Sequence, residues 1–348
     1  MQIPTSAPIL VTGATSFLGS HIINSLLQQD FKVKATVRSL SNKSSYDFLY
    51  ALNPEKKDNL EVIEADLLNL EAWKTALKGV EYVIHTAAII ADKEEKEAFK
   101  LVVEGVLNVL NAAVDSGVKR IVLTSSAMTT YYGTEGKIAG PEDWAVEEEC
   151  NLFVKSKLQA EKAAWQFYKE NEGKIELVTV LPGFLLGPVF APNNGMNEKL
   201  IADMLSNKLA GISKVNWPVV DVRDAAECHI RALLSEKSNG KRYICASNSM
   251  WMDNIASILR DEFVKYGYSI SRHLLTKAEI VAAALVEGKL KEGLGEIGVE
   301  RLVDNELSIK DLGIKYENPE KTVIEMGYSL IKAGIVKNKI SAEERKLE

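Results

Sequence analysis

Short apolar runs rich in β-branched residues alternate with segments of helical periodicity over the first two-thirds of the chain. The apolar runs predict strands over residues 7–13, 31–38, 59–67, 80–88, 120–127 and 175–183. Apolar positions spaced three and four residues apart predict helices over residues 19–30, 70–79, 101–117 and 150–165. Strands that alternate with helices form a parallel sheet covered on both faces, so we predict an α/β fold with a doubly wound parallel sheet.

The alternation ends near Pro188, where a segment rich in Asn, Gly and Pro begins. A strand followed by a helix returns over 215–234, another strand follows at 241–247, and the chain beyond Met250 is mainly helical. This order predicts two interleaved domains. The predicted boundaries are 1–187 with a return segment near 215–248 for the sheet domain, and 188–214 with 249–348 for a smaller, mostly helical domain.

The stretch VTGATSFLGS follows the first strand and opens the first helix. A glycine turn in this position lets the backbone approach the pyrophosphate of a dinucleotide, whose charge then lies at the helix N-terminus. The motif has Gly13, Ser16 and Gly19, with serine at its middle position. Serine is small but resists positive φ, so we expect a local adjustment of the backbone there. A purely structural turn is the alternative, and we predict Rossmann-type dinucleotide binding.

The ends of the next strands narrow the choice of dinucleotide. NAD-binding chains usually carry an acid after the second strand, and NADP-binding chains carry an arginine. The sequence ATVRSLSNKS places Arg38 there, with Lys43 close behind, which predicts NADP; a plain surface arginine is the alternative. Asp66 ends the third strand, where it either hydrogen-bonds the adenine or caps the following helix. The small residues Thr86 to Ala88 end the fourth strand and leave room for a ribose.

Composition excludes several classes of function. The net charge is −6, so the chain has no excess of Lys and Arg to neutralise a nucleic acid. Cys150, Cys228 and Cys245 lack metal-ligand spacing, and we expect free thiols, packed in the core, in a reducing compartment. The chain shows no leader pattern, and no apolar run reaches the roughly 20 residues that span a bilayer. We therefore expect a cytoplasmic protein with no nucleic-acid, membrane or metal partner.

The segments TGATSFLG, ATVR, ADL, HTAA, GVLNVLNAA, VLTSSA, KSKLQAEKAAW, LPGFLLGP and VDVRDAAECH occur in one order over nearly the whole chain. In this order and spacing the sequence resembles the extended short-chain dehydrogenase/reductases. The branch it resembles contains the dihydroflavonol 4-reductases, the cinnamoyl-CoA reductases and the yeast methylglyoxal (aldehyde) reductases. The resemblance implies NADPH-dependent reduction of a small or aromatic aldehyde or ketone, with the smaller domain binding the substrate.

The resemblance also implies roles for single residues. The family's carbonyl-polarising serine corresponds to Ser126, with Ser125 beside it, and the lysine that holds the nicotinamide ribose corresponds to Lys157. Pro182 and Gly183 match the segment that shapes the nicotinamide pocket. With the strand ends described above, the residues expected at the cofactor are Gly13, Thr15, Ser16, Phe17, Leu18, Gly19, Arg38, Lys43, Asp66, Leu67, Thr86, Ala87, Ala88, Ser125, Lys157, Pro182 and Gly183.

The position of the family's catalytic tyrosine is Phe153, four residues before Lys157. Loss of a general acid costs about 10²–10⁴-fold in rate, so a weakened reductase is expected. Tyr131 and Tyr132 either supply a substitute acid or pack as part of the wall. Phe153 is equally consistent with a Tyr-to-Phe change made to trap a complex, and with an NADP-binding regulatory protein that has little turnover. An epimerase or dehydratase acting on a nucleotide sugar is the neighbouring enzymatic function.

The remaining polar residues are expected to be structural. His85 and His229 are assigned to the core, and Asp221, Arg223 and Asp224 to an ion-pair network between the domains. We see no exposed apolar stripe and expect a monomer. Candidate residues of a substrate pocket, which core packing explains equally well, are Ile89, Ile90, Met128, Leu186, Phe190 and Trp217.

Overall fold

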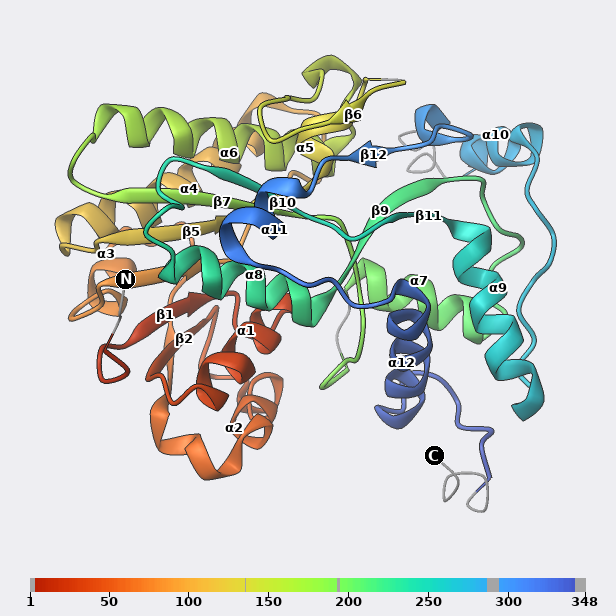
Figure 1. Ribbon diagram of the computed structural model, residues 1–348, viewed down its shortest axis with the longest axis horizontal. Helices are drawn as coiled ribbons and strands as arrows, with labels where there is room; N and C mark the ends of the chain where they lie inside the picture. The colour runs from red at the N-terminus through yellow and green to blue at the C-terminus, as the bar shows by residue number, and fades with distance from the viewer. Residues whose placement is uncertain (1–3, 135, 193–194, 287–293, 342–348) are drawn as a thin grey trace.

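The central element of the fold is a seven-stranded sheet with the strand order β10-β7-β5-β4-β1-β2-β3 (Figure 1). The computed structural model describes residues 4–134, 136–192, 195–286 and 294–341. All neighbouring strands of this sheet run parallel, as predicted. Its strands are β1 (Ile9–Thr12), β2 (Val33–Val37), β3 (Leu60–Glu64), β4 (Tyr82–His85), β5 (Arg120–Thr124), β7 (Glu176–Pro182) and β10 (Arg242–Cys245).

Helices cover both faces of the central sheet. Successive residues of a strand point to opposite faces, and in β1 both faces are buried: Ile9 and Val11 lie in one core and Leu10 in the other. This burial on both sides explains why the strands appear in the sequence as continuous apolar runs. The first face carries α1 (Phe17–Gln28) and α8 (Val222–Leu234), and the second carries α3 (Leu70–Ala76), α4 (Lys96–Asp115) and α6 (Leu152–Glu170).

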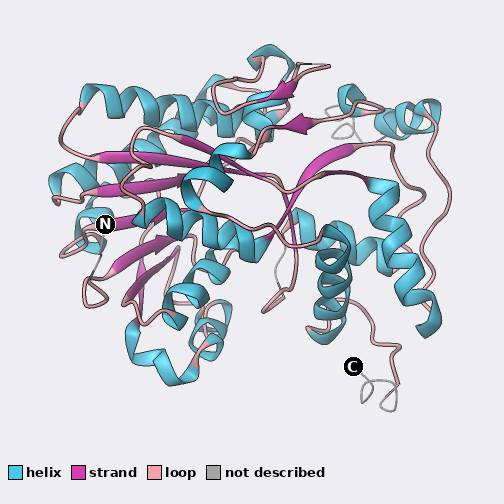
Figure 2. Cartoon of the chain, in the orientation of Figure 1, coloured by secondary structure: helices cyan, strands magenta, loops and turns pink. Residues whose placement is uncertain are grey.

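A smaller sheet extends beyond the carboxyl ends of the central strands (Figures 1 and 2). Its strands pair in the order β11-β9-β8, with β8 parallel and β11 antiparallel to β9. They are β8 (Phe184–Leu186), β9 (Asn216–Asp221) and β11 (Ser249–Trp251). The helices on this side are α7 (Met196–Leu205), α9 (Met252–Phe263), α10 (Lys277–Val286) and α12 (Pro319–Lys332).

Short elements complete the described part of the chain. A two-stranded parallel sheet joins β6 (Ile138–Ala139) and β12 (Leu302–Val303). The short α-helices are α2 (Phe48–Leu52), α5 (Met128–Tyr131) and α11 (Glu306–Leu312). The 3₁₀ helices are η1 (Lys43–Ser45), η2 (Pro54–Asn59), η3 (Glu147–Glu149) and η4 (Val264–Tyr266).

The sequence predicts the order of these elements well. The six predicted strands and the return of a strand and helix over 215–234 are confirmed, the latter as β9 and α8. The strand predicted at 241–247 contains β10, which joins the central sheet beside β7. Asn193 and Asn194 of the predicted loop, and residues 287–293 at the start of the Gly-rich joint, lie outside the described residues.

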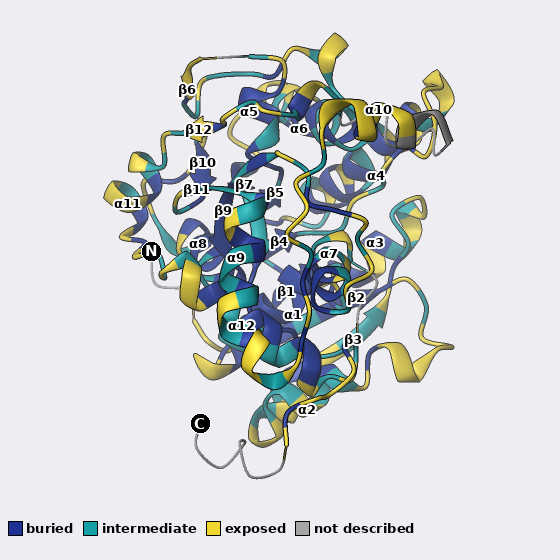
Figure 3. Cartoon of the chain, turned by 90° about the vertical axis from the view of Figure 1, so that its right-hand side faces the viewer, coloured by how far each residue is buried: buried dark blue, intermediate teal, exposed yellow. Residues whose placement is uncertain are grey.

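The distribution of buried residues follows this layering. Figure 3 shows buried residues on the strands of the central sheet and exposed residues on the outer turns of α9 and α12. Within the described ranges, no helix has both the length and the apolar character needed to cross a membrane.

Candidate active site

The turn after β1 lies tightly against the loop after β4. Gly13 has φ of +64°, a conformation that residues with a side chain rarely adopt. A Cβ atom on Gly13 would lie 2.7 Å from Thr86 Oγ1 and 3.0 Å from Ala87 N. A Cβ atom on Gly19 would lie 2.3 Å from the carbonyl oxygen of Gly13. The backbone therefore needs both glycines, as a dinucleotide-binding turn does.

Ser16 is accommodated without the expected adjustment. Its φ is −73° and its ψ is 162°, which is ordinary extended backbone. Its Oγ accepts a hydrogen bond of 3.0 Å from Gly19 N, so Ser16 is the N-cap of α1. The expectation of local strain at Ser16 is wrong, because the positive φ of this turn falls at Gly13 and not at the middle position.

The first turn of α1 is anchored in the core by its side chains. Phe17 and Leu18 are buried against the central sheet, and Thr15 is partly buried in the turn before them. Helices leave their first backbone N–H groups without intrahelical partners, and these groups suit an anion. The start of α1 can therefore offer backbone donors to a pyrophosphate.

Two cations follow β2. Arg38 is exposed, and it makes no hydrogen bond or ion pair with any residue that the structure describes. Lys43 is 74% exposed and its Nζ lies 4.0 Å from Asp47. The nearby Glu64 accepts a hydrogen bond of 2.7 Å from Leu40 N and so holds the loop after β2. The end of β2 thus presents positive charge, which suits a phosphate group.

Asp66 does not cap the helix that follows it. Its Oδ1 accepts a hydrogen bond of 2.9 Å from Leu68 N, within the turn after β3. Asn69 caps α3 instead, accepting a hydrogen bond of 3.1 Å from Ala72 N. The N-cap alternative for Asp66 is therefore wrong, and Leu67 beside it faces a pocket.

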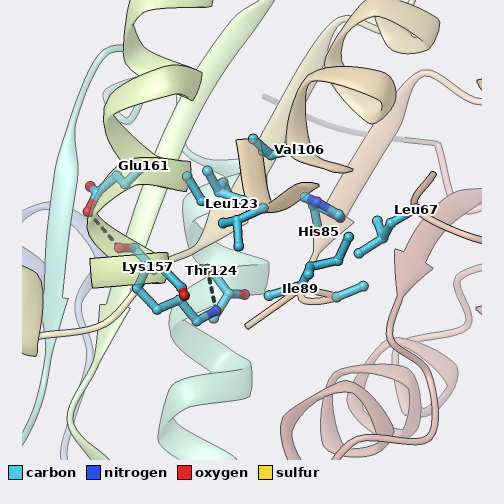
Figure 4. A pocket seen from close by; sticks show the side chains of 14 residues that line it. Leu67, His85, Ile89, Val106, Leu123, Thr124, Lys157 and Glu161 are labelled. Atoms are coloured by element: carbon cyan, nitrogen blue, oxygen red, sulfur yellow. Dashed lines mark hydrogen bonds between the residues drawn. The ribbon is translucent and has the colours of Figure 1, made fainter. Parts of the chain in front are cut away.

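This pocket lies where the carboxyl ends of β4 and β5 meet α4 and α6 (Figure 4). It contains about 390 Å³ of empty space, part of it continuous with solvent. The pocket brings together five of the predicted site residues, Leu67, Ala87, Ala88, Ser125 and Lys157. The other lining residues are His85, Ile89, Val102, Val106, Leu123, Thr124, Ser156, Ala160 and Glu161.

Thr12 links the glycine turn to this pocket. Its Oγ1 accepts a hydrogen bond of 3.0 Å from Ala87 N and lies 2.7 Å from His85 Nδ1. Thr86 Oγ1 donates to the carbonyl oxygen of Thr12 at 2.6 Å. The predicted small residues after β4 are therefore held directly against the end of β1.

Lys157 extends from α6 to the end of β5. Its Nζ donates a hydrogen bond of 3.3 Å to the carbonyl oxygen of Thr124. In Figure 4 Glu161 lies to one side of Lys157, and Ile89 and His85 lie to the other. Burial lowers the pKa of Lys157 to about 8, while the charge of Glu161 acts in the opposite direction. The amine can therefore gain and lose a proton near neutral pH.

A buried hydrogen-bond network around Glu161 holds the residues next to the pocket in place. Glu161 Oε2 accepts hydrogen bonds from Ser125 Oγ at 2.5 Å and Thr129 Oγ1 at 3.0 Å. Its Oε1 accepts from Thr179 Oγ1 at 3.0 Å and from Arg242 Nε at 2.8 Å. Burial acts to raise the pKa of Glu161, but Arg242 and these hydrogen bonds outweigh it and hold the pKa below its usual range. Ser125 is thus committed to the network.

Ser126 lies beside the network without joining it. Ser126 is buried, and its Oγ accepts a hydrogen bond of 3.3 Å from Met128 N. Its hydroxyl hydrogen is not used in that bond. Of the two adjacent serines, Ser126 therefore has the hydroxyl that remains able to polarise another group.

Phe153 packs at the edge of an apolar cluster. It is partly buried and contacts the cluster that contains Tyr131 and Tyr132, whose side chains are 2% and 3% exposed. Tyr132 Oη accepts a hydrogen bond of 3.3 Å from Asn151 Nδ2. Burial raises the pKa of Tyr132 to about 12, and it raises the pKa of Tyr131 as well. These contacts support the packing alternative for both tyrosines.

The end of β7 is fixed by its backbone. Pro182 O accepts a hydrogen bond of 2.9 Å from Ala127 N, and Gly183 N donates one of 2.9 Å to Cys245 O. A Cβ atom on Gly183 would lie 2.4 Å from Pro218 O, so a larger residue does not fit. Pro182 and Gly183 are therefore next to the serine loop, but they do not line the pocket.

Both histidines assigned to the core are buried. His229 Nδ1 lies 2.7 Å from Ala225 O and therefore carries the proton, while its Nε2 accepts from Thr124 Oγ1 at 2.8 Å. Burial lowers the pKa of His229 to about 4 and the pKa of His85 to about 3. Their structural assignment holds, although His85 also lines the pocket, which its apolar sequence context did not indicate.

The ion-pair network expected around Asp221 is confirmed for Asp221 and Arg223, whereas Asp224 forms no ion pair with the residues that the structure describes. Arg223 Nη2 lies 2.6 Å from Asp221 Oδ2 and 2.5 Å from Glu325 Oε2 on α12. Asp224 accepts a hydrogen bond of 2.7 Å from Glu317 N. This network ties α8 to α12. Within the described ranges, no group of three or more acidic, histidine or cysteine residues is arranged to hold a metal ion.

The candidate substrate residues do not form one pocket. Ile89 lines the pocket, whereas Leu186 is buried in the core and Ile90 is exposed. Phe190 stacks on His21 with ring centroids 4.1 Å apart, and Trp217 stacks on Phe184 at 4.8 Å. Met128 packs against the same apolar cluster as Phe153. Of the cysteines, all free, Cys228 and Cys245 are packed in the core as expected, and Cys150 is partly exposed.

Sequence reasoning missed Glu161 as part of the site. Its signal was its position on the helix, because residues four apart lie on one face and Glu161 follows Lys157 by four. His21 was missed too, and no pattern in the sequence pointed to its contact with Phe190, which is far away along the chain.

The amino-acid sequence is similar to a known protein family and to several reductases. A sequence model described as "NAD dependent epimerase/dehydratase family" matches residues 9–246. Tetraketide alpha-pyrone reductase 1 of Arabidopsis thaliana is 34% identical over 266 residues, which cover 72% of this chain and 79% of that protein. An NADPH-dependent methylglyoxal reductase of Saccharomyces cerevisiae is 27% identical over 353 residues, covering 93% and 98% of the two chains.

A solved structure is similar over the same range. The yeast methylglyoxal/isovaleraldehyde reductase complexed with NADPH superposes with a TM-score of 0.76 at 25% sequence identity. The match covers 93% of this chain and 98% of that chain. The similarity therefore extends through the small sheet and its helices as well as the central sheet.

Proposed function

This chain belongs to the NAD dependent epimerase/dehydratase family, and we propose that within it the protein is an NADPH-dependent reductase of small or aromatic aldehydes and ketones. One observation carries the proposal: the glycine turn and Lys157 meet at one edge of the sheet. There β1 and β4 are neighbours, while α1 and α4 after them lie on opposite faces. Open α/β sheets bind their ligands at such a switch point.

The residues at this edge fit a dinucleotide. Cβ atoms on Gly13 and Gly19 would collide with neighbouring atoms of the protein, so both glycines allow the tight turn that a dinucleotide-binding motif requires. Ser16 caps α1 by accepting a hydrogen bond from Gly19 N. Residues Thr86 to Ala88 are small and stand beside the pocket. In the proposed complex the glycine turn holds the pyrophosphate and the pocket edge receives the nicotinamide ribose.

Arg38 supports NADP as the cofactor. It is exposed at the end of β2 and has no partner in the part of the chain that the structure describes, so its guanidinium is available for a 2′-phosphate. Lys43 adds a second positive charge nearby. The acid that would bind a free 2′-hydroxyl is missing from the end of β2, and Glu64 on β3 is occupied by Leu40 N.

The chain's own residues supply binding and polarisation. Bound NADPH supplies the hydride of the reduction. Ser126 donates a hydrogen bond to the carbonyl oxygen, which stabilises the negative charge that develops there. Lys157 holds the nicotinamide ribose and adds positive charge. Phe153 occupies the tyrosine position without a hydroxyl, so the reaction is slowed and the proton comes from another group.

Phe153 also favours one competing function, an NADP-binding regulatory protein with little turnover. A screen of aldehydes and ketones for NADPH oxidation separates the two functions. The reductase proposal expects turnover on at least one carbonyl class, and Gly13→Val is the control because its side chain would collide with Thr86 and Ala87 and distort the glycine turn. Tight NADPH binding with no turnover on any carbonyl would favour the regulatory function.

The protein is further proposed to act as a monomer in the cytoplasm. Its three cysteines are free, which suits a reducing compartment. Light scattering at micromolar concentration is expected to give the mass of one chain, 38.4 kDa. A stable dimer would overturn the monomer and leave the reductase proposal in place.

A further inference from the structure

Phe153 leaves open which group protonates the product. Hydride addition to a carbonyl carbon moves the π electron pair onto oxygen, and the resulting alkoxide needs a proton. The side chain of Phe153 carries no exchangeable hydrogen, so the proton must come from a neighbouring group. The acids near the pocket differ in their hydrogen bonds and in their proton affinity.

The two nearby tyrosines are poor donors. Tyr131 is 2% exposed, and burial raises its pKa above the ordinary range. Tyr132 Oη is engaged by Asn151 Nδ2 at 3.3 Å, and burial raises its pKa to about 12. A general acid works best when its pKa lies near the working pH. The pKa values of both phenols are far above pH 7, so both are weak proton donors in neutral solution.

Ser125, His85 and His229, three polar side chains around Lys157, hold no transferable proton. Ser125 Oγ donates to Glu161 at 2.5 Å in the buried network. His229 uses both ring nitrogens, on Ala225 O and Thr124 Oγ1. Burial lowers the pKa values of His229 and His85 to about 4 and about 3, so both rings are neutral at pH 7. None of these groups arrives at the reaction carrying an acidic proton.

Lys157 differs from all of them. Its Nζ reaches the pocket from α6 and makes one long hydrogen bond, 3.3 Å, to Thr124 O. An ammonium group has three donors. Counting only residues that the structure describes, the other two N–H groups of Lys157 have no protein partner. One of them can hold the nicotinamide ribose, and the other remains available for the oxygen of a substrate in the pocket.

Resting on the proposed reductase function, we propose that Lys157 is the proton donor of this enzyme, in the role that a tyrosine at position 153 would have. The hydride forms the new C–H bond, and the carbonyl π pair moves to oxygen. One N–H bond of the Lys157 ammonium breaks and an O–H bond forms on the product, which leaves a neutral amine. Water that enters the pocket returns a proton to this amine before the next turnover.

The proposal predicts a pH dependence with a definite sign. The titratable groups that face Lys157 are Glu161 from α6, His85 from β4 and His229 from α8. Both histidines stay neutral above about pH 5, and Glu161 stays ionised, so Lys157 alone titrates near neutrality. Burial places its pKa at about 8. Turnover is full below this pH and falls about tenfold per pH unit above it, because the donor must be protonated.

A double-mutant cycle tests the role of Lys157. Lys157→Arg keeps a positive hydrogen-bond donor, but arginine does not release its proton in this pH range. In the wild-type background we expect a loss in kcat of about 100-fold or more, the scale of one general acid. In the Phe153→Tyr background the phenol supplies the proton, so we expect a loss of less than about tenfold. NADPH affinity, measured by fluorescence, is expected to stay within about threefold in both backgrounds, since the charge near the cofactor is kept.

Lys155→Arg is the matched control for this cycle. Lys155 lies two residues earlier on α6, pairs with Glu94 and stands 5.2 Å from the centre of the Phe99 ring, outside the pocket. The control is expected to leave kcat unchanged. If Lys157→Arg lowers kcat by the same factor in both backgrounds, Lys157 only positions the cofactor and the proposal fails. Wild-type turnover that stays constant up to pH 10 would overturn it as well.

The outcomes separate this proposal from the proposed function. Turnover by Phe153→Tyr with none by the wild-type protein would keep the reductase and overturn Lys157 as donor. No turnover by either protein on any carbonyl would overturn both. A readout without turnover is the pH dependence of acetylation by acetic anhydride, followed by mass spectrometry with Lys155 as reference. Lys157 is expected to titrate near pH 8, and a midpoint at or above pH 10 would contradict the proposal.

Discussion

At the scale of single residues, Phe153 differs from tyrosine by one oxygen atom, and it packs against an apolar cluster. Phe153→Tyr is expected to raise kcat by about 10- to 100-fold at pH 9, where Lys157 has largely lost its proton, and by less at pH 7. NADPH affinity should not change, because no cofactor contact is altered. Steady-state kinetics at both pH values check this. Phe153→Leu is the control, and an equal gain from leucine would show that the hydroxyl is not the cause.

Arg38 is the residue on which the choice of cofactor depends. Arg38→Asp removes a charge-assisted contact to the 2′-phosphate and introduces repulsion, so we expect NADPH affinity to fall by about tenfold or more and NADH affinity to rise. Fluorescence titration with both cofactors measures this. Lys32→Asp is the charge-matched control, since Lys32 is exposed before the opposite end of β2. Equal wild-type affinities for NADPH and NADH would contradict the account.

The sequence predicts residue types better than it predicts their partners. Gly13 and Gly19 were identified because close backbone approach leaves glycine as the residue that fits. The competition between Asp66 and Asn69 for the cap of α3 was not foreseen, since two polar residues precede the helix and only geometry decides. Apart from Trp165 on the same helix, the partners of Glu161 come from α5, β7, β10 and the loop after β5, and local sequence carries no information about them.

At the scale of elements, Glu161 and Arg242 join the site helix α6 to strand β10. Both side chains are buried, and Nε of Arg242 lies 2.8 Å from Oε1 of Glu161. Glu161→Ala leaves a buried guanidinium without its counter-charge, so we expect the free energy of unfolding to fall by about 3–5 kcal/mol. Urea denaturation of the purified variant measures it.

A more exposed ion pair, between α6 and the 3₁₀ helix η3, provides the control. Lys162 and Glu147 lie 3.1 Å apart, and their side chains are 45% and 32% exposed. Lys162→Ala is expected to change the free energy of unfolding by less than about 1 kcal/mol. Equally small losses for Glu161→Ala and Lys162→Ala would show that the buried network contributes little to stability.

The sequence predicted the elements that have a strong hydrophobic pattern. It did not predict the short strands, which form only because they pair with distant segments. The strands of the central sheet are apolar on both faces, which makes them visible in the sequence. Strands β8 and β11 have three residues each, too few to show a period. The helix predicted from residue 101 begins at Lys96, and its start was missed because Lys96 and Glu97 are polar and exposed.

At the scale of the whole molecule, three of the four histidines are buried and neutral. Burial lowers the pKa values of His21, His85 and His229 to about 4, 3 and 4, below the ordinary value of 6.5. The unfolded chain therefore binds more protons between about pH 6.5 and 4, and stability is lost as the pH falls through this window. Each histidine contributes about 3 to 5 kcal/mol at most, since one pKa unit corresponds to about 1.4 kcal/mol.

The urea midpoint at pH 7 and pH 4.5 measures this loss. We expect His229→Asn to reduce the difference in stability between pH 7 and pH 4.5 by about the contribution of one histidine. The substitution is also expected to lower stability at both pH values. His273→Gln is the control, because His273 is exposed and paired with Glu279. Loss of the pH dependence in the control variant would assign the acid sensitivity to the surface instead.

The overall topology was predictable because βα alternation leaves few choices. Parallel strands with intervening helices give a doubly wound sheet, and right-handed crossovers fix its order closely. Strand β10 pairs with β7, which lies about 60 residues earlier in the chain, and no local sequence pattern predicts this pairing. The arrangement of β8, β9 and β11 beyond the central sheet depends on similar long-range pairing.

The central claim is that this chain transfers a hydride from NADPH to a carbonyl carbon. The most direct measurement uses NADPH that carries deuterium at the transferred position, a panel of aldehydes and ketones, and mass spectrometry of the products. We predict an alcohol with one deuterium on the carbinol carbon, formed slowly by the wild-type protein and faster by Phe153→Tyr at pH 9. The claim is contradicted if neither protein yields a labelled alcohol from any carbonyl while both bind NADPH.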